Sequence, residues 1–512
     1  MRRKENWRAA IYTRSSWASK SRFKTARRWS SSVCMKRRAT CMITFTLRRA
    51  VCKNFKRRVR SSCWGIGWRT VVNPTCTCRM RMKIKTCLFV ASNSPFSFWH
   101  SGTSNRIAMA YYSLSRIGIE MHVVRFLDEQ ILPQTIAYEE QFHGETGESR
   151  NLAASWEDIR YRRVGNNESW LRHIDQSLFD PVALIYPEAE YFGQIIRSRC
   201  EKLEPDLIWG VWIPSSAGIY YSNPRVPWIS THTDWMFQLM KIRAHWKSRI
   251  TPVRRRDDLF STMKLQWRSW LWKRADLQYL KECAAVETGS TVQAREMQGF
   301  GLENIHVVPS AYEPVAIDLE DYASLQDPQI VHLGSLATTS NKIGLSGYLK
   351  EAHPFLDDRL RAQGHNARLV IIGDTKAADT VLREMIMNAK ATCTGFVHDL
   401  STILRPYDIQ IIPYEYISGL RTKVALHFNY AQVVVATRAS VRGMPELVAG
   451  ENCILVDSVK EFPEALEHLI QVPELRVKYG RNARATFERE YTLDRQIERY
   501  QNILDSLNTG PN

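Results

Sequence analysis

The sequence predicts an α/β protein with two Rossmann-like, doubly wound domains that face each other across a cleft. Three observations predict this class. From Lys83 onward, short apolar strands alternate with helical segments; the alternation stops in a polar, acidic stretch between Pro314 and Pro328; and a second series of strands and helices follows. Strands that alternate with helices form parallel sheets, and such sheets bind ligands at the carboxyl ends of their strands. Each domain is therefore expected to offer one such edge to the cleft.

Four segments are expected along the chain. Residues 1–82 form a basic extension, 83–315 a first Rossmann-like domain, 325–485 a second Rossmann-like domain, and 486–512 a C-terminal helix that packs back across the domains. The last expectation rests on apolar residues that recur on one helical face between Thr492 and Leu507.

The positive charge of the chain is confined to its first 82 residues. The 512 residues carry a net charge of +19, but residues 1–82 hold 23 Lys and Arg and one acidic residue, a net of +22. The remainder holds 48 basic and 51 acidic residues, a net of −3. The extension has no apolar run for a signal peptide or a membrane span. Nothing in the globular part therefore calls for a nucleic-acid partner.

Three interpretations of the extension stay open: a targeting segment, a nucleic-acid-binding arm, or a chain start placed too far upstream. We favour the last, because Met82 directly precedes the first orderly strand. The extension is then disordered or spurious, and a chain that starts at Met82 should keep its melting temperature and activity.

Cysteine usage points to a reducing compartment. Six of the eleven cysteines lie in the extension, and the others are scattered. Cys76 and Cys78 have no second pair at zinc spacing, so we expect no metal site there. A cytoplasmic protein is expected, with peripheral membrane contact as an open alternative.

The first domain opens with a strand–helix–strand unit. Thr86–Ala91 is expected to be a buried strand, Arg106–Ile117 an amphipathic helix closed by Gly118, and Met121–Phe126 the next strand. The loop around Gly102 lies at the carboxyl end of the first strand, where ligands bind. Gly102 could equally serve only the turn.

Further along the first domain, His232 and Asp234 come just after a strand introduced by Pro227. A histidine there could contact a sugar or phosphate, or cap the next helix. Strands over 284–288 and 305–309 are expected to finish the domain.

Residues 236–275 combine helical spacing with tryptophans and basic side chains. A helix of this kind can lie in an anionic membrane interface, or its tryptophans can pack inward on a domain surface. The residues concerned are Trp246, Trp267, Trp270, Trp272, Lys241, Arg243, Lys247, Arg254, Arg255, Arg256, Arg268, Lys273 and Arg274.

The second domain begins with a strand that ends at Gly334. A helix is expected around Leu345–Phe355, then a strand that ends at Gly373 and a short strand before Gly395. Gly334 and Gly373 directly follow strands, where the backbone must let a nucleotide or a helix come close.

The next unit, residues 408–443, predicts an anion site. An apolar strand, Ile409–Ile412, leads into a loop with Gly419, a helix, and a β-branched strand over 433–437. The start of a helix after a parallel strand favours phosphate, and Arg421 and Lys423 add positive charge. An ordinary crossover with solvated basic residues is the alternative.

With these elements in order, the chain resembles a group 1 glycosyltransferase of the GT-B type. The resemblance covers about residues 83–508 and rests on a succession of motifs at family-like intervals, among them PDLIWG, HVVPSAY, IVHLGS, LVIIGD, TGFVHDL and GLRTKVALHFNYAQVVVATRASVRGM. It implies a nucleotide-sugar donor held mainly by the second domain and a glycan, lipid-linked or polysaccharide acceptor received by the first. It also implies retention of configuration.

The resemblance implies roles for individual residues. Those on the donor side are Gly334, Gly373, Phe396 by the nucleotide base, Ser418, Gly419 and Leu420 in the diphosphate loop, and Arg421 and Lys423 at the diphosphate. Gly102 and His232 would face the transferred sugar from the other domain. His232, Arg421 and Lys423 are the expected catalytic residues, because fixed cations can stabilise the leaving diphosphate. No DxD-type acidic pair follows a strand, so neither a metal nor a cofactor is expected.

The sequence also departs from the family. Leu426 and Ser418 occupy positions where members commonly have glutamates, Ala431 begins a segment that usually reads Gly-x-Pro, and Ser335 replaces a basic residue. A non-catalytic protein that keeps the fold is therefore the main alternative to a transferase. A sugar-nucleotide epimerase and a nucleic-acid-binding protein are further alternatives.

Overall fold

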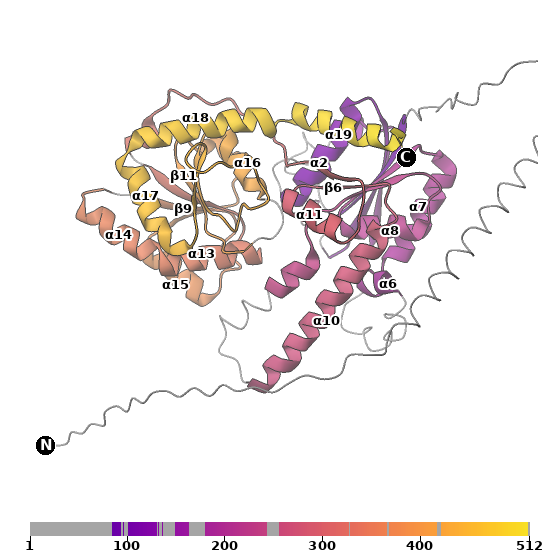
Figure 1. Ribbon diagram of the computed structural model, residues 1–512, viewed down its shortest axis with the longest axis horizontal. Coiled ribbons are helices and arrows are strands. Elements are labelled where there is room, and N and C mark those ends of the chain that lie inside the picture. Colours follow the sequence, from indigo (N-terminus) through magenta and orange to yellow (C-terminus); the bar gives the residue numbers. More distant parts are fainter. Residues whose placement is uncertain are drawn as a thin grey trace, which may run out of the picture. The chain divides into compact units, whose positions relative to one another are not determined.

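The computed structural model describes residues 84–93, 96, 101–130, 132, 136, 149–162, 180–242, 255–326, 328–365, 368–416 and 421–509 (Figure 1). All of them lie in one compact unit, Arg81–Asn512. The predicted extension, residues 1–82, falls outside the described residues, and so do Ser418, Gly419 and Leu420.

The first sheet has seven parallel strands in the order β3-β2-β1-β4-β5-β6-β7. Its central strands are buried on both faces, as their nearly continuous apolar sequences predict. The direction of strand succession reverses between β1 and β4, which is where doubly wound sheets open a ligand crevice. The strands are β1 (Thr86–Ser92), β2 (Glu120–Asp128), β3 (Ser155–Tyr161), β4 (Leu207–Val211), β5 (Trp228–Thr231), β6 (Ala285–Thr288) and β7 (Ile305–Val307).

Helices cover both faces of this sheet because successive strand residues point to opposite sides. On β1, Phe89 belongs to the core cluster that holds α2, whereas Leu88 belongs to the cluster that holds α7 and α8. The helices are α2 (Gly102–Arg116), α6 (Pro181–Ile185), α7 (Ala189–Leu203), α8 (Ile213–Ser222), α10 (Arg255–Leu280) and α11 (Thr291–Gly299). None of the helices in the described ranges is long and apolar enough to cross a membrane.

The second sheet has six parallel strands in the order β10-β9-β8-β11-β12-β13. Its strands are β8 (Gln329–Leu333), β9 (Arg368–Ile372), β10 (Thr392–Gly395), β11 (Ile409–Ile412), β12 (Val433–Thr437) and β13 (Cys453–Val456). Val331 on β8 faces the core with α16 (Thr422–Asn429), and Ile330 faces the core with α13 (Thr339–Glu351). The two sheets, each covered on both faces, confirm the predicted α/β class with two Rossmann-like domains.

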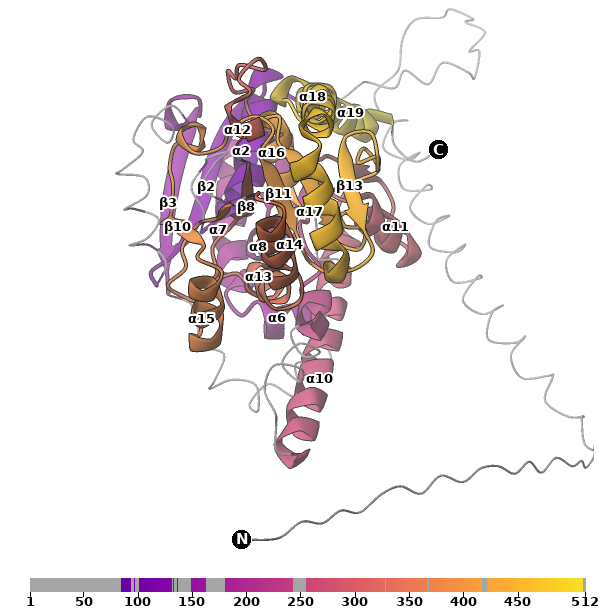
Figure 2. The ribbon, with the colours of Figure 1, turned by 90° about the vertical axis from the view of Figure 1, so that its left-hand side faces the viewer.

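Around the second sheet, α13 and α14 (His353–Ala362) lie where a single helix was expected over Leu345–Phe355. The helix breaks at Ala352, because Pro354 has no backbone N–H and disfavours helical geometry just before it. α14 packs beside α17 (Phe462–Gln471), as Figure 2 shows. The remaining helices are α12 (Ala323–Gln326), α15 (Thr380–Asn388), α18 (Pro473–Glu490) and α19 (Leu493–Thr509).

The segment that links the two sheets is tied to α16. Asn429 at the end of α16 donates from Nδ2 to the carbonyl of Glu313 (2.7 Å), and its Oδ1 accepts from the N–H of Val315 (3.0 Å). One side chain thus satisfies two backbone groups of the linker.

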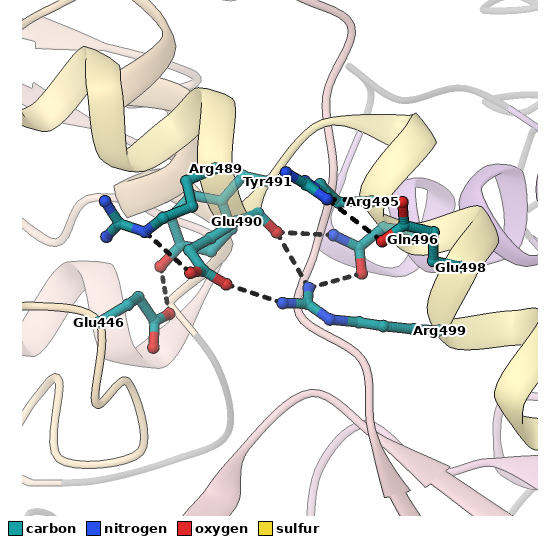
Figure 3. Close-up of polar contacts among 8 residues, drawn as sticks. All are labelled: Glu446, Arg489, Glu490, Tyr491, Arg495, Gln496, Glu498 and Arg499. Atoms are coloured by element: carbon teal, nitrogen blue, oxygen red, sulfur yellow. Dashed lines mark hydrogen bonds and ion pairs between the residues drawn. The ribbon is translucent and has the colours of Figure 1, made fainter.

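At the junction of α18 and α19 the chain passes from the second sheet to the first. Tyr491 is fully buried, and its hydroxyl donates to Glu446 (Figure 3). Arg499 in the second turn of α19 donates to the carbonyl of Glu490 (3.0 Å) and to its carboxylate (2.8 Å), which fixes the start of α19 on the last residue of α18 (Figure 3). α19 then packs against α2, as the apolar face over 492–507 predicts.

Candidate active site

The N-terminus of α16 follows the carboxyl end of β11, as the 408–443 pattern predicts. Arg421 occupies the position before the helix, and its side chain makes no capping hydrogen bond. Arg421 therefore leaves the N-terminus of α16 without a side-chain cap, and the helix dipole favours an anion there. The predicted loop residues Ser418, Gly419 and Leu420 precede this point and lie outside the described residues.

A second helix N-terminus lies next to that of α16. Gly102 is the first residue of α2, not part of the preceding loop, and Ser101 caps the helix by accepting from the N–H of Ser104. A Cβ atom at Gly102 would lie 3.5 Å from Oγ1 of Thr422, the first residue of α16. Two positive helix ends thus meet at one place. Without an anion between them they repel, so the arrangement suits a phosphate.

The side chain of Lys423 points into the interior of the second domain. Its Nζ donates to the carbonyl of Leu333 (2.5 Å), to Oδ1 of Asn341 (2.9 Å) and to the hydroxyl of Tyr414 (2.9 Å). Burial, and after it the charge of Arg421, lowers the pKa of Lys423 to about 7. All three hydrogens of the ammonium group are therefore used by the protein itself.

Arg421 is held in a different way. Its guanidinium lies over the ring of Tyr414, 4.7 Å from the ring centre, and the side chain is buried. Its Nε and one terminal nitrogen, Nη2, are buried without a hydrogen-bond partner in the described part of the chain. A buried arginine with unused donors is costly unless a ligand satisfies them, and guanidinium groups match phosphate geometry.

The two glycines after β8 and β9 make room for this arrangement. Gly334 has a φ of +134°, and a Cβ there would overlap the side-chain amide of Asn341. Gly373 has a φ of +125°, and a Cβ there would lie 2.7 Å from the carbonyl carbon of Gly334. Gly334 is therefore required by the side chain of Asn341, which in turn binds Lys423, and Gly373 is required by the backbone of Gly334.

The remaining donor-side residues are placed as follows. Phe396 follows Gly395 at the end of β10, and 56% of its surface is exposed. Leu426 points into the apolar core, so the common glutamate is replaced by a core side chain. In the described ranges no three His, Cys, Asp or Glu side chains come together as metal ligands would.

His232 lies in a buried setting at the carboxyl end of β5. Its Nδ1 is 3.4 Å from the hydroxyl of Tyr279, and its ring lies 4.6 Å from that of Trp235. Burial lowers the pKa of His232 to about 3, so the ring is neutral, and its Nε2 has no partner among the described atoms. Asp234 follows in the same loop. Burial raises the pKa of its carboxyl, against the effect of the charges of Arg421 and then Arg106.

The structure thus brings Gly102, Arg421, Lys423 and the His232 loop to one region. Sequence reasoning did not find Tyr414, Asn341 or Tyr279. Tyr414 could have been noticed, because it directly follows β11 and Pro413 at the carboxyl edge of the sheet. Asn341 and Tyr279 lie inside helical segments, and nothing in their local pattern separates them from other helix residues.

Comparison with known proteins decides the family of the second domain. Residues 327–472 match the family model described as glycosyl transferases group 1. The second domain is therefore similar to that of group 1 glycosyltransferases. Among curated proteins, none matches it.

Solved structures with the GT-B fold are similar to this chain over most of its length. HepE of Anabaena, solved with UDP and glucose, has a TM-score of 0.53 at 13% identity and covers 83% of this chain and 100% of its own. S. aureus TarM, solved with Fondaparinux, alpha-GlcNAc-glycerol and UDP, has a TM-score of 0.55 at 10% identity, with 82% and 100% covered. Sucrose-phosphate synthase of Thermosynechococcus elongatus has a TM-score of 0.56 at 11% identity, with 83% and 100% covered. At these identities the likeness establishes the GT-B fold.

Proposed function

We propose that this protein transfers a sugar from a nucleoside diphosphate sugar to a hydroxyl group of a glycan acceptor, either lipid-linked or polysaccharide. The observation that carries the proposal is the meeting of two helix N-termini beside Arg421, whose buried donors have no partner in the described part of the chain. These groups together offer the charge and the hydrogen bonds that a diphosphate needs. UDP is the first nucleotide to test, because HepE and TarM were both solved with it.

In the proposed reaction the diphosphate leaves with growing negative charge. Arg421, Lys423 and the N-terminus of α16 stabilise this charge, and they are fixed in place before the reaction begins. Because the protein supplies these positive groups, we propose that the transfer needs neither a divalent metal nor a cofactor. Retention of configuration follows from the resemblance to the family. Gly102 and His232 face the transferred sugar from the first domain.

A panel of nucleotide sugars tests this function. We expect turnover, by hydrolysis or by transfer, with at least one of them in the presence of a metal chelator. Lys423→Ala should reduce the rate about 10²-fold or more, the usual effect of removing a transition-state charge partner. Lys350→Ala is the matched control, because Lys350 is exposed at the end of α13 and should leave the rate unchanged.

Absence of turnover across the panel, together with absence of nucleotide binding in calorimetry, would contradict the proposal. It would favour a non-catalytic protein in which Leu426, buried where family members have a glutamate, marks the lost donor site.

We also propose that α10 touches a membrane that presents the acceptor. In the described part of the helix, Met263 and Trp270 are 60% and 44% exposed, and the guanidinium of Arg274 lies 4.9 Å from the Trp270 ring centre. Trp272, by contrast, packs against Tyr186 at 5.3 Å. The segment 243–254 and the side chains of Arg255 and Arg256 lie outside the described residues.

Vesicle sedimentation tests this contact. The protein should bind anionic but not neutral vesicles at low salt and should dissociate as the salt rises toward several tenths molar. Replacing both Trp270 and Arg274 by Ser should weaken binding, whereas Gln266→Ser on the same helix should not. Equal binding to both vesicle types, or to neither, would show that α10 is ordinary domain surface.

A further inference from the structure

Behind His232 lies a buried chain of hydroxyl and carboxyl groups. The Tyr186 hydroxyl donates to Oδ1 of Asp276 (2.9 Å), the Tyr279 hydroxyl lies 3.4 Å from the same oxygen, and it also lies 3.4 Å from Nδ1 of His232. These four side chains come from the end of α6, from α10 and from the loop after β5, and none is more than 5% exposed. Three separate elements therefore build one internal path that ends at His232.

Asp276 is a fully buried carboxyl group whose hydrogen-bond partners are neutral hydroxyls. In the described ranges it forms no ion pair with a Lys or Arg, and its Oδ2 has no hydrogen-bond partner. Burying such a group is unfavourable, and burial accordingly raises the pKa of Asp276 to about 7. Buried titratable groups with shifted pKa values are concentrated at functional sites, so Asp276 is a candidate for a functional role.

The protons available to these side chains determine which ring nitrogen of His232 is protonated. When Asp276 is ionised, above its pKa of about 7, Tyr279 donates its one hydroxyl proton to Asp276, and the Tyr279 oxygen is left only as an acceptor toward His232. The neutral imidazole must then carry its proton on Nδ1, and its Nε2 keeps a lone pair. The hydrogen-bond partner of one ring nitrogen thus determines whether the other ring nitrogen is protonated.

The direction of Nε2 follows from the shape of the ring. Because Nδ1 faces Tyr279 on α10, Nε2 points away from that helix, and it is buried without a partner among the described atoms. The same loop carries Asp234, whose carboxyl feels the charge of Arg421 on the donor side. The loop thus carries a buried hydrogen-bond acceptor, Nε2 of His232, together with a carboxyl that feels the charge of Arg421.

We propose that Asp276 and Tyr279 are positioning residues that hold His232 in the Nδ1–H tautomer, so that Nε2 accepts a hydrogen bond from a hydroxyl of the donor sugar. The tautomer is a property of the unliganded protein. The sugar contact rests on the proposed function.

The tautomer can be read directly by ¹⁵N NMR of the full chain labelled on histidine, because protonated and unprotonated ring nitrogens have well-separated shifts. Comparison with His232→Gln identifies the signals. We expect the Nδ1–H form in the wild-type chain. Tyr279→Phe removes the acceptor for Nδ1–H, and Asp276→Leu frees the Tyr279 proton to be donated to Nδ1, so both variants should move the proton to Nε2. Tyr186→Phe is the matched control, since it removes a donor to the same Asp276 oxygen but leaves the path to His232, and it should keep the Nδ1–H form.

Kinetics supply the second measurement. Loss of the acceptor at Nε2 should raise KM for the donor by up to about tenfold in Tyr279→Phe, with a smaller change in kcat, and Tyr186→Phe should change neither. A deoxy-sugar donor that lacks the recognised hydroxyl should abolish the difference between Tyr279→Phe and the wild-type chain.

Two results would overturn the proposal: a wild-type His232 with its proton on Nε2, or a tautomer that stays the same in both Tyr279→Phe and Asp276→Leu. The wild-type spectrum alone decides the first, whether or not the variants fold. The expected tautomers in a protein without any turnover would support the positioning role and count against the proposed function instead.

Discussion

Burial changes the protonation of Lys423 in the unliganded protein. The protein satisfies all three of its hydrogens with Leu333, Asn341 and Tyr414, yet burial and the charge of Arg421 bring its pKa to about 7. Close to neutral pH the amine is therefore only partly protonated in the unliganded protein. In the proposed function a diphosphate brings negative charge close to this amine, which favours the ammonium form and raises the pKa of Lys423. Donor binding and protonation of Lys423 are then coupled.

Calorimetry of UDP binding should detect this coupling. At about pH 8, above the pKa of the free protein, binding should take up a fraction of a proton, so the measured heat should depend on the ionisation enthalpy of the buffer. The affinity should fall as the pH rises from 7 to 9, because a proton must then be supplied from increasingly basic solution. Lys423→Arg keeps its charge throughout this range and should remove the Lys423 contribution to proton uptake. An equal uptake in both proteins would assign the proton to another group.

The contrast between Lys423 and its partners shows what sequence can predict at the residue scale. Arg421 and Lys423 could be placed at an anion site because they follow a parallel strand and open a helix. Their partners could not be predicted in the same way. Asn341 and Tyr414 reach Lys423 from α13 and from the segment after β11, and only the packing of α13 on the sheet brings them together.

Among the elements, α13 supports the site through one of its two glycines. A Cβ at Gly344 would overlap the ring of Tyr414, on which Arg421 lies and to which Lys423 donates. A Cβ at Gly347, one turn further on, would meet nothing within 4 Å. The two glycines thus lie on the same helix, but only Gly344 faces a buried side chain.

This difference predicts opposite effects of alanine. Gly347→Ala should stabilise the protein by about 0.5–1 kcal/mol, because alanine restricts the unfolded chain and favours the helix. Gly344→Ala should destabilise it by about 1–3 kcal/mol through overpacking against the buried Tyr414 ring, and it should weaken UDP binding. Urea unfolding and calorimetry measure both effects. Equal unfolding free energies for the two variants would contradict the tight contact at Gly344.

The order of elements followed from the sequence more reliably than their bounds. The alternation of strands and helices predicted both sheets, because burial on two faces leaves a clear apolar pattern. The break between α13 and α14 was missed although Pro354 signals it, and Gly102 was assigned to a loop although Ser101 can cap a helix. At Ala431 the residue type conflicts with the backbone conformation. Its φ is +52°, which alanine disfavours, and the family usually has glycine at this position.

For the molecule as a whole, α19 matters because it follows the second sheet in sequence but completes the core of the first domain. Tyr500 is fully buried, and its ring lies 5.3 Å from that of Trp209 on β4. Burial, and after it the charge of Glu287, raises the pKa of the Tyr500 hydroxyl, so this hydroxyl stays protonated beside the carboxylate. Glu287 is in turn paired with Arg106 of α2 and accepts from Thr231 of β5. The first domain therefore depends on the last helix of the chain for part of its interior.

Tyr500→Ala should show this dependence. Removing a buried aromatic ring should lower the free energy of unfolding by about 3–5 kcal/mol. Local opening should increase most in the elements that contact the ring. In hydrogen exchange we expect faster exchange in β4 and α2, with protection in β8 and β11 little changed, because α19 packs against α2 and the Tyr500 ring lies beside Trp209 on β4. Asn502→Ala, at an exposed position on the same helix, should leave both sheets unchanged. Faster exchange concentrated in β8 and β11 would contradict the assignment of α19 to the first domain's core.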